Sequence, residues 1–331
     1  MTGPVRAAVL HEHGGSPLVE ERNKPVGDGE AVVRVFAVPL TPLDLLCAGG
    51  TSYFGAPPLP YVPGVQGVGE VVEHPTLAPG TPVWFPTEAG MSPGDGALAT
   101  TVRRPAAELV DLGDHEVPAT DVAAIGLSGV AAWLALTWRA ELREGEQVLV
   151  LGAGGVVGQV AVQAARILGA RRVVAAARSA GGRARAEHAG ADAVVALEDG
   201  DEVLDVVARL SAVTDGPVDV VLDPLAGVAA SAGVRLLGER GRLVNLGGSA
   251  APSFEVMSAD LRSRTASVLG YTNNAIPTEQ KAEALRTLLE HAAAGRLRVE
   301  HEVVPLTEVG SAWARQAAGQ APVRIVVDLR G

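Results

Sequence analysis

Cysteine is almost absent from this chain of 331 residues, which contains a single one, Cys47. One thiol excludes a disulfide framework and any zinc ribbon, because both need several thiolates. Basic residues are also few: 27 stand against 38 acidic residues, and the net charge is −11. This balance argues against a protein that follows nucleic-acid phosphates or anionic lipid. Any anion-binding site must therefore be a local arrangement.

Signals for export or membrane insertion are missing as well. Residues 1–6 lack the basic start and apolar run of a signal peptide, so we expect a cytoplasmic protein. Residues 148–165 carry no charge over a length near the roughly 18 residues of a membrane span. Their glycine cluster, with Gln159 and Gln163, instead predicts a buried strand followed by a buried helix. We therefore expect no membrane partner.

The first third of the chain reads as short β segments separated by proline and glycine. The candidate strands are Val5–Leu10, Ala31–Val38, Val68–Glu73 and Leu98–Val102. Strands of about five residues with such punctuation predict an antiparallel barrel or sandwich.

From about Thr120 onward, apolar strands alternate with helical stretches, as in β-α-β units with a parallel sheet. Six candidate strands in this region predict one doubly wound sheet. They are 147–151, 172–177, 193–196, 218–222, 242–246 and 267–271, and the first helix is 156–168. After Tyr271 the pattern predicts a helix at 278–294, a strand near 299–304, a helix at 307–318 and a strand at 323–329.

A glycine-rich turn joins the first of these strands to its helix. Gly152, Gly155 and Gly158 fit the spacing G-x-x-G-x-x-G. A strand that ends in such a turn and opens into a helix presents backbone N–H groups and a helix dipole to a pyrophosphate. The predicted cofactor contacts of this loop are Gly152, Gly154, Gly155, Val156, Val157 and Gly158.

The end of the second strand indicates which dinucleotide binds. NAD-binding proteins with this loop have Asp or Glu about 20 residues after it. In this chain the strand instead ends in Ala177-Arg178-Ser179, and Arg183 and Arg185 follow. Guanidinium groups without a carboxylate favour a 2′-phosphate, and hence NADPH. Arg178 and Ser179 are the main candidates and Arg183 is a further one. At least one of Arg183 and Arg185 is alternatively a solvated helix face.

With these motifs, the chain resembles the medium-chain dehydrogenase/reductase superfamily, most closely its zinc-independent quinone oxidoreductase and enoyl reductase branch. The resemblance is carried by residues 41–44, 59–64, 152–165, 218–223, 241–247 and 324–327. It implies an α/β protein with a GroES-like β-barrel domain at 1–122, a Rossmann domain at 123–271 with strand order 3-2-1-4-5-6, and a return to the first domain at 272–331.

This chain differs from the zinc-dependent members of the superfamily at the positions of their zinc ligands. Where those enzymes hold catalytic zinc, this chain has Thr41, Val65-Gln66 and Leu127. No cysteine stands in the segment of the structural zinc, between Trp84 and Thr100. The resemblance therefore implies a metal-free enzyme. Hydride donation from NADPH to a quinone or an α,β-unsaturated carbonyl needs no metal, unlike alcohol oxidation.

Two hydroxyl groups are candidates for assisting that reduction. Tyr53 matches a tyrosine that lies near the nicotinamide in this branch, and it is either a proton donor or a wall of the pocket. Thr41 is the second candidate, whereas Asp44 is expected to be structural and Cys47 to be a buried, inert thiol. Toward the nicotinamide, the resemblance places Leu246, Gly247 and Tyr271.

Two alternatives to a quinone or enone reductase stay open. One is a trans-acting enoyl-thioester reductase of a biosynthetic pathway, and the other is a non-catalytic, NADPH-binding redox sensor. In each case the apolar strand 267–271 is expected at the sheet edge, where it would pair with a second copy in a homodimer.

Overall fold

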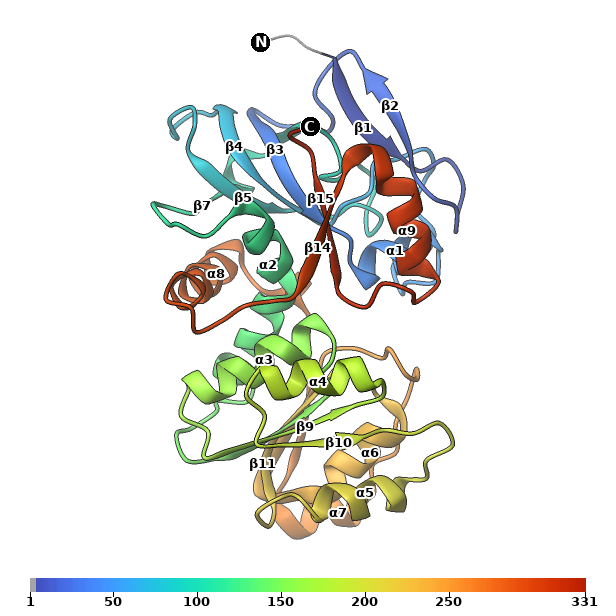
Figure 1. Ribbon diagram of the computed structural model, residues 1–331, viewed down its shortest axis with the longest axis vertical. Coiled ribbons are helices and arrows are strands. Elements are labelled where there is room, and N and C mark those ends of the chain that lie inside the picture. The colour runs from blue at the N-terminus through green and yellow to red at the C-terminus, as the bar shows by residue number, and fades with distance from the viewer. Residues whose placement is uncertain (1–3) are drawn as a thin grey trace. The chain divides into compact units, whose positions relative to one another are not determined.

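A six-stranded parallel sheet forms the core of the C-terminal half of the chain (Figure 1). Its order, β10-β9-β8-β11-β12-β13, is the predicted order 3-2-1-4-5-6. Each strand is a short run of Val, Leu and Ala, and the central ones are buried on both faces, as in parallel sheets covered by helices. The strands are β8 Gln147–Leu151, β9 Arg172–Ala177, β10 Ala193–Ala196, β11 Val218–Asp223, β12 Leu237–Asn245 and β13 Ser267–Gly270.

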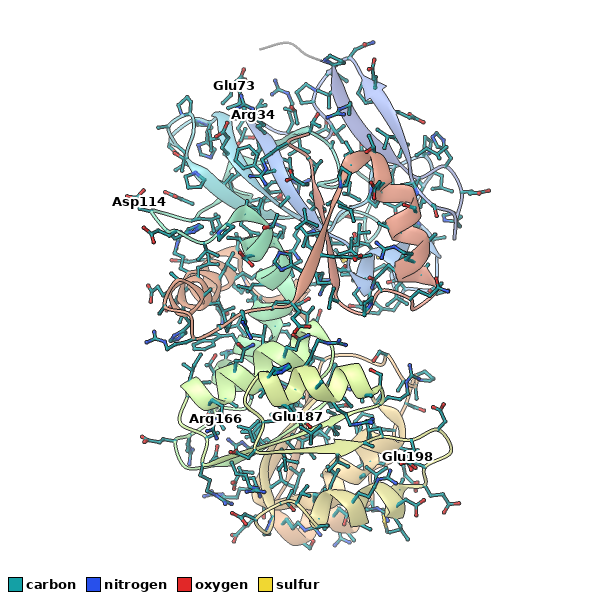
Figure 2. The ribbon with its side chains drawn as sticks, viewed as in Figure 1. Arg34, Glu73, Asp114, Arg166, Glu187 and Glu198 are labelled. Atoms are coloured by element: carbon teal, nitrogen blue, oxygen red, sulfur yellow. The ribbon has the colours of Figure 1, made fainter. Side chains whose placement is uncertain are left out.

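Helices cover both faces of this sheet (Figure 1). On one face, α3 packs on β8 and β9, and α4 packs on β9 and β10. On the other face α6 packs on β11 and β12, with α5 beside it. Charged side chains such as Arg166, Glu187 and Glu198 lie on the outside (Figure 2). These helices are α3 Val156–Ile167, α4 Ala180–His188, α5 Val203–Ser211, α6 Gly227–Leu236 and α7 Ser258–Arg264. Helix α8, Thr278–Ala293, follows the last strand of the sheet in the chain.

The N-terminal segment and the C-terminal end share a second, mainly antiparallel sheet, of order β14-β15-β3-β4-β5-β7, with β6 also paired to β3. Its only parallel pair along this path is β14 with β15, and β1 and β2 form a separate hairpin. This is the predicted GroES-like domain. Its elements are β1 Val5–Val9, β2 Leu18–Arg22, β3 Ala31–Pro39, α1 Pro42–Ala48, β4 Gln66–Glu73, β5 Pro82–Pro86, β6 Thr101–Arg104, β7 Val110–Asp111, β14 His301–Pro305, α9 Val309–Ala317 and β15 Arg324–Asp328.

The computed structural model describes residues 4–331, which divide into two compact units. The first ends at Leu127 and resumes at Val299–Gly331, and the second is Ser128–Arg298. These limits differ from the predicted boundaries. The chain was predicted to return to the first domain at residue 272, but residues 272–298 belong to the unit of the parallel sheet. The physical reason is α8, whose His291 ring lies 5.7 Å from the ring of Trp133.

Helix α2, Ala119–Leu134, continues into a π-helix at Ala135–Arg139. Together they form the one described helical stretch that is long and apolar enough to cross a membrane, but 67% of its most apolar window is buried inside the protein. Its apolarity is therefore accounted for by core packing. Residues 148–165, which have the length of a span, form β8 and most of α3 as predicted.

Candidate functional site

The glycine loop is a tight turn between β8 and α3. Gly152 has a φ of +63°, a conformation that favours glycine, and it directly follows the last residue of β8. The turn is held by Ala153 N, which donates to Ala176 O at 3.0 Å, and by Gly155 N, which donates to Gly152 O at 3.1 Å. Gly155 is the N-cap of α3. The loop thus ties the ends of β8 and β9 to the start of the helix.

Glycine stands at three positions of this loop for different physical reasons. A Cβ atom on Gly158 would lie 2.4 Å from Ala153 Cα, and one on Gly154 would lie 2.5 Å from Gly182 Cα. Both positions therefore permit a close approach of backbone to backbone. A Cβ atom on Gly155 would meet nothing nearer than Gly152 O at 3.6 Å. Since no protein packing requires glycine at 155, the open face there is suited to a ligand.

The start of α3 has the character of an anion site. The first turn of a helix leaves backbone N–H groups without partners in the helix, here those of Val156, Val157 and Gly158. No acidic side chain stands in that turn. The partial positive charge of the helix N-terminus is therefore not offset by a carboxylate of the same turn. A glycine cradle with these donors fits a pyrophosphate.

Arg178 stands just beyond the end of β9, exposed to solvent, and its side chain has no hydrogen bond or ion pair within residues 4–331. Ser179 next to it is the N-cap of α4 and accepts from Gly182 N at 3.0 Å. No carboxylate occurs between residues 172 and 182. A free guanidinium, a hydroxyl and a helix N-terminus thus lie together at the position where a dinucleotide's adenosine ribose is read.

The two later arginines are not a solvated helix face. Arg183 Nη1 donates to Arg178 O at 2.7 Å, so this side chain holds the backbone at the end of β9. Arg185 Nε donates to Gly154 O in the glycine loop at 3.0 Å. Arg185 was not among the predicted contacts. The sequence did indicate that Arg185 lies on the same helix face as Gly182, because residues three apart share a face. That Gly182 contacts Gly154 in the glycine loop is visible only in the structure.

At the ends of β11 and β12, a buried carboxylate organises the turns. Asp223 Oδ1 accepts from Leu225 N and Ala226 N, and Asp223 Oδ2 accepts from Asn245 Nδ2 at 2.7 Å. Burial raises the pKa of Asp223, and these hydrogen bonds oppose the rise. Asn245 Nδ2 also donates to Gly247 O at 2.8 Å. The pair therefore shapes the turn that contains the predicted contacts Leu246 and Gly247.

Ala226 in this turn has φ 61° and ψ −155°, a backbone conformation that only glycine adopts readily. We expect Ala226→Gly to raise the free energy of unfolding by about 1 kcal/mol, because relief of strain exceeds the added flexibility of the unfolded chain. Denaturant unfolding measures this. The matched control, Ala230→Gly in the interior of α6, is expected to lower stability by about 1 kcal/mol. Destabilisation by Ala226→Gly would contradict the strain.

Tyr271, the third predicted contact near the nicotinamide, follows β13. Its backbone N donates to Asn245 O at 2.9 Å, and its hydroxyl donates to Asn273 Oδ1 at 2.7 Å. Burial raises the pKa of the Tyr271 hydroxyl. Tyr271 thus stays protonated near neutral pH and is connected through Asn245 to the Asp223 turn.

In the first unit, Thr41 and Asp44 form the capping box of α1. Thr41 Oγ1 donates to Asp44 Oδ2 at 2.6 Å, while Asp44 Oδ1 accepts from Gly64 N and Val65 N at 3.0 Å each. The hydroxyl hydrogen of Thr41 is therefore already donated. The structure gives Thr41 a capping role in place of the predicted catalytic one, and Asp44 the structural role expected of it.

Tyr53 lies in the loop after α1 and is 82% exposed. Its ring packs against Phe54, with 4.2 Å between the ring centroids. The hydroxyl has no hydrogen-bond partner among residues 4–331, which leaves it open to a substrate. Cys47, in α1, is buried as predicted, and burial raises the pKa of its thiol to about 11.

The positions where zinc-dependent members hold their metal ligands make other contacts in this chain. Gln66 Oε1 accepts from Trp84 Nε1 and from Leu127 N, each at 2.8 Å. Val65 is buried and apolar. Within residues 4–331 no three His, Cys, Asp or Glu side chains are placed to share a metal ion. This donor set does not fit zinc, which prefers thiolate, imidazole and carboxylate.

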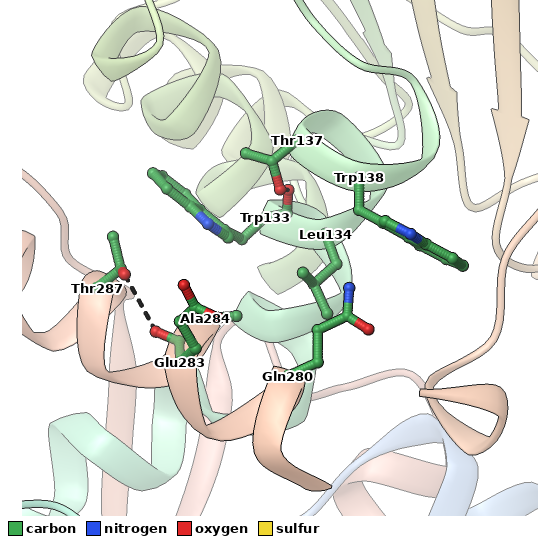
Figure 3. A pocket seen from close by; sticks show the side chains of 8 residues that line it. All are labelled: Trp133, Leu134, Thr137, Trp138, Gln280, Glu283, Ala284 and Thr287. Carbon is green, nitrogen blue, oxygen red and sulfur yellow. Dashed lines mark hydrogen bonds between the residues drawn. The ribbon is translucent and has the colours of Figure 1, made fainter. Parts of the chain in front are cut away.

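A groove of about 430 Å³ lies between α8 and the end of α2 with the π-helix that continues it (Figure 3). The hydroxyls of Thr137 and Thr287 are engaged by the backbone oxygens of Trp133 and Glu283. None of the predicted site residues lines this groove. Its lining is Trp133, Leu134, Thr137, Trp138, Gln280, Glu283, Ala284 and Thr287.

Known proteins with sequences similar to this chain include reductases. The profile described as zinc-binding dehydrogenase matches residues 156–290, all in the second unit. The human quinone oxidoreductase is 29% identical over 81% of this chain and 80% of its own length. The mitochondrial enoyl-[acyl-carrier-protein] reductase of Arabidopsis thaliana is 28% identical over 93% of this chain and 84% of its own. These matches support the medium-chain dehydrogenase/reductase superfamily, and within it the quinone and enoyl reductase branch, as the family that this chain resembles.

A longer polypeptide and several solved structures are also similar to this chain. A phenolphthiocerol/phthiocerol polyketide synthase of Mycobacterium tuberculosis is 29% identical over 93% of this chain, which spans only 14% of that much longer polypeptide. A mycobacterial quinone oxidoreductase has the same fold, with a TM-score of 0.84, 22% identity and coverage of 98% and 100%. The YhdH oxidoreductase of Salmonella enterica, solved with NADP, has a TM-score of 0.80, 20% identity and coverage of 98% and 100%. These two structures show that the chain has their fold.

Proposed function

We propose that this protein is an NADPH-dependent, metal-free reductase of a quinone or an α,β-unsaturated carbonyl compound. The observation that carries the proposal is the free Arg178 guanidinium beside Ser179 at the N-terminus of α4, with no carboxylate at the end of β9. A carboxylate there would accept from a ribose 2′-hydroxyl and repel a 2′-phosphate, whereas Arg178 attracts the phosphate.

Different residues would bind the cofactor and supply the proton. When bound, NADPH supplies a hydride to the electrophilic carbon of the acceptor. The glycine loop and the first turn of α3 would hold the pyrophosphate, and the turn at Leu246 and Gly247 with Tyr271 would hold the nicotinamide end. Negative charge then develops on the acceptor's oxygen and a proton completes the reduction. Because the hydroxyl hydrogen of Thr41 is engaged by Asp44, Tyr53 is the proposed proton source.

A panel of acceptors tests the function. The protein is mixed with NADPH and a series of quinones and enones, and loss of the absorbance of reduced nicotinamide near ~340 nm is followed. We expect turnover with at least one acceptor, and a slower rate for Tyr53→Phe at unchanged NADPH affinity. Tight NADPH binding without turnover of any acceptor would overturn the proposal in favour of a redox sensor.

An enoyl thioester is the second candidate substrate. It is favoured by the plant enoyl-[acyl-carrier-protein] reductase and by the polyketide synthases among the relatives. Adding an enoyl thioester to the acceptor panel separates the two candidates. Turnover of the thioester at a kcat/KM far above that of free quinones and enones would assign the protein to thioester reduction.

We expect the purified enzyme to contain no stoichiometric zinc and to keep its full rate after treatment with a chelator. The reason is the donor set at the zinc positions, where an amide oxygen already accepts two hydrogen bonds. Elemental analysis and the reductase assay measure these two properties. One zinc per chain, or inactivation that added zinc reverses, would contradict the metal-free assignment.

The free edge of the parallel sheet, β13, is expected to pair with a second copy. Its backbone pairs with β12 on one side only, and exposed strand edges are usually paired or covered. Sedimentation at micromolar concentration should therefore give twice the mass of the chain. A monomer under these conditions would speak against the homodimer.

A further inference from the structure

The carbonyl of Gly154 is the one group of the glycine loop with two side-chain donors. Arg185 Nε donates to it at 3.0 Å from α4, and Gln159 Nε2 donates at 3.2 Å from the second turn of α3. Neither contact is needed to complete helix α3 or helix α4. Both side chains are directed at a single backbone oxygen.

A backbone carbonyl group can weaken the binding of an anion by a loop. Its oxygen carries partial negative charge, and if it turned toward the pyrophosphate it would repel it, since such loops work by presenting N–H groups. A positively charged donor on that oxygen offsets the charge and fixes the peptide's orientation. Hydrogen bonds from charged donors are about twice as strong as neutral ones.

Helix α4 is also fixed to the loop by shape. A Cβ atom on Gly154 would lie 2.5 Å from Gly182 Cα, so the first turn of α4 touches the loop backbone to backbone. Arg185 is one turn further along the same helix. The guanidinium has no ion-pair partner within residues 4–331, so its charge is not neutralised beside the loop.

We propose that Arg185, with Gln159, is a positioning residue that holds the Gly154 carbonyl away from the bound pyrophosphate and thereby sets the affinity for the part common to NADPH and NADH. This inference rests on the proposed nucleotide site. It assigns different tasks to neighbouring arginines: Arg178 reads the 2′-phosphate, whereas Arg185 acts on the glycine loop.

Two small ligands separate these tasks. ADP carries the pyrophosphate without a 2′-phosphate, and adenosine 2′-monophosphate carries the reverse. We expect Arg185→Gln to weaken ADP binding about 10-fold and to leave adenosine 2′-monophosphate binding within about 2-fold, as measured by calorimetric titration and by nuclear magnetic resonance. Arg185→Lys should recover part of the ADP affinity, because it restores a charged donor without the planar fork.

Arg166→Gln is the matched control, because Arg166 is an exposed arginine of the same unit that pairs with Asp192 and touches no loop residue (Figure 2). It should leave both affinities unchanged. An Arg185→Gln protein that binds ADP as tightly as the wild type would overturn the inference. So would a loss of adenosine 2′-monophosphate binding as large as the loss of ADP binding.

A measurement without ligand keeps this test independent of the proposed function. Amide hydrogen exchange of residues 152–158 should accelerate about 10-fold in ligand-free Arg185→Gln, but not in Arg166→Gln, because the Gly154 peptide loses its charged donor. Unchanged exchange would overturn the positioning role. If the wild-type protein bound neither ADP nor NADPH, the proposed function would fail, and accelerated exchange alone would show that Arg185 orders a loop without a nucleotide.

Discussion

Replacing Gly158 with alanine should both destabilise the protein and abolish nucleotide binding. The new Cβ atom would lie 2.4 Å from Ala153 Cα and 2.6 Å from Gly152 O, and neither backbone atom can rotate away. Helix α3 must therefore move off the loop, and overpacking of this kind costs about 2–3 kcal/mol. Denaturant unfolding and titration with NADPH measure the two effects.

Gly155→Ala is the matched control in the same loop. Its φ of −81° suits alanine, and the nearest atom to its Cβ is 3.6 Å away. We expect its unfolding free energy to match that of the wild type within about 0.5 kcal/mol. NADPH affinity should fall, because the added methyl group occupies space that the ligand would take. Equal stability losses in Gly155→Ala and Gly158→Ala would contradict the division of the glycines into packing and ligand positions.

Most strands of the parallel sheet were predictable because they are short apolar runs bounded by turns, whereas β12 begins at Leu237, five residues before its predicted start at Arg242. β8, β9 and β10 have the predicted bounds, and β11 differs from its prediction by a single residue. A strand buried on both faces needs no alternation of polar and apolar residues, so composition and length alone identify it. The turn at Gly152 was similarly visible, since its backbone requires glycine.

Elements of the antiparallel unit were harder to predict because they are held by partners distant in sequence. β2 has mostly exposed side chains, and β5 begins and ends with proline, so neither gives an apolar strand signal. The register of each is set by pairing, with β1 and with β4. The hydrogen bonds of Gln66 to Trp84 and Leu127 likewise join three segments that no local pattern connects.

The same limit applies to the arginines of the candidate site. The absence of a carboxylate after β9 is a local feature, and it predicts a cationic reader at the strand end. Which arginine is free depends on acceptors elsewhere: Arg183 is engaged by the Arg178 carbonyl and Arg185 by that of Gly154. Only the folded chain shows that, of the three, the Arg178 side chain is the one not engaged by the backbone.

Arg178→Ala is therefore expected to weaken NADPH binding by about 10–100-fold and to leave NADH binding unchanged. The range corresponds to the roughly 1.5–3 kcal/mol of a hydrogen bond to a charged group. Arg183→Ala should have a smaller effect, because that side chain supports the backbone at the strand end. Fluorescence titration with both dinucleotides gives the ratio of the two dissociation constants for each variant.

Arg171→Ala provides the control for loss of one positive charge. Arg171 is an exposed arginine next to the opposite end of β9, where it pairs with Asp215 at 3.7 Å. Its removal should shift both affinities by less than about 2-fold, since exposed charges far from the phosphate are screened by salt. If wild-type protein bound NADH as tightly as NADPH, or if Arg178→Ala kept the NADPH preference, the 2′-phosphate would be read by other residues or not at all. A preference that disappears in Arg178→Ala and persists in Arg171→Ala would place its recognition at the end of β9.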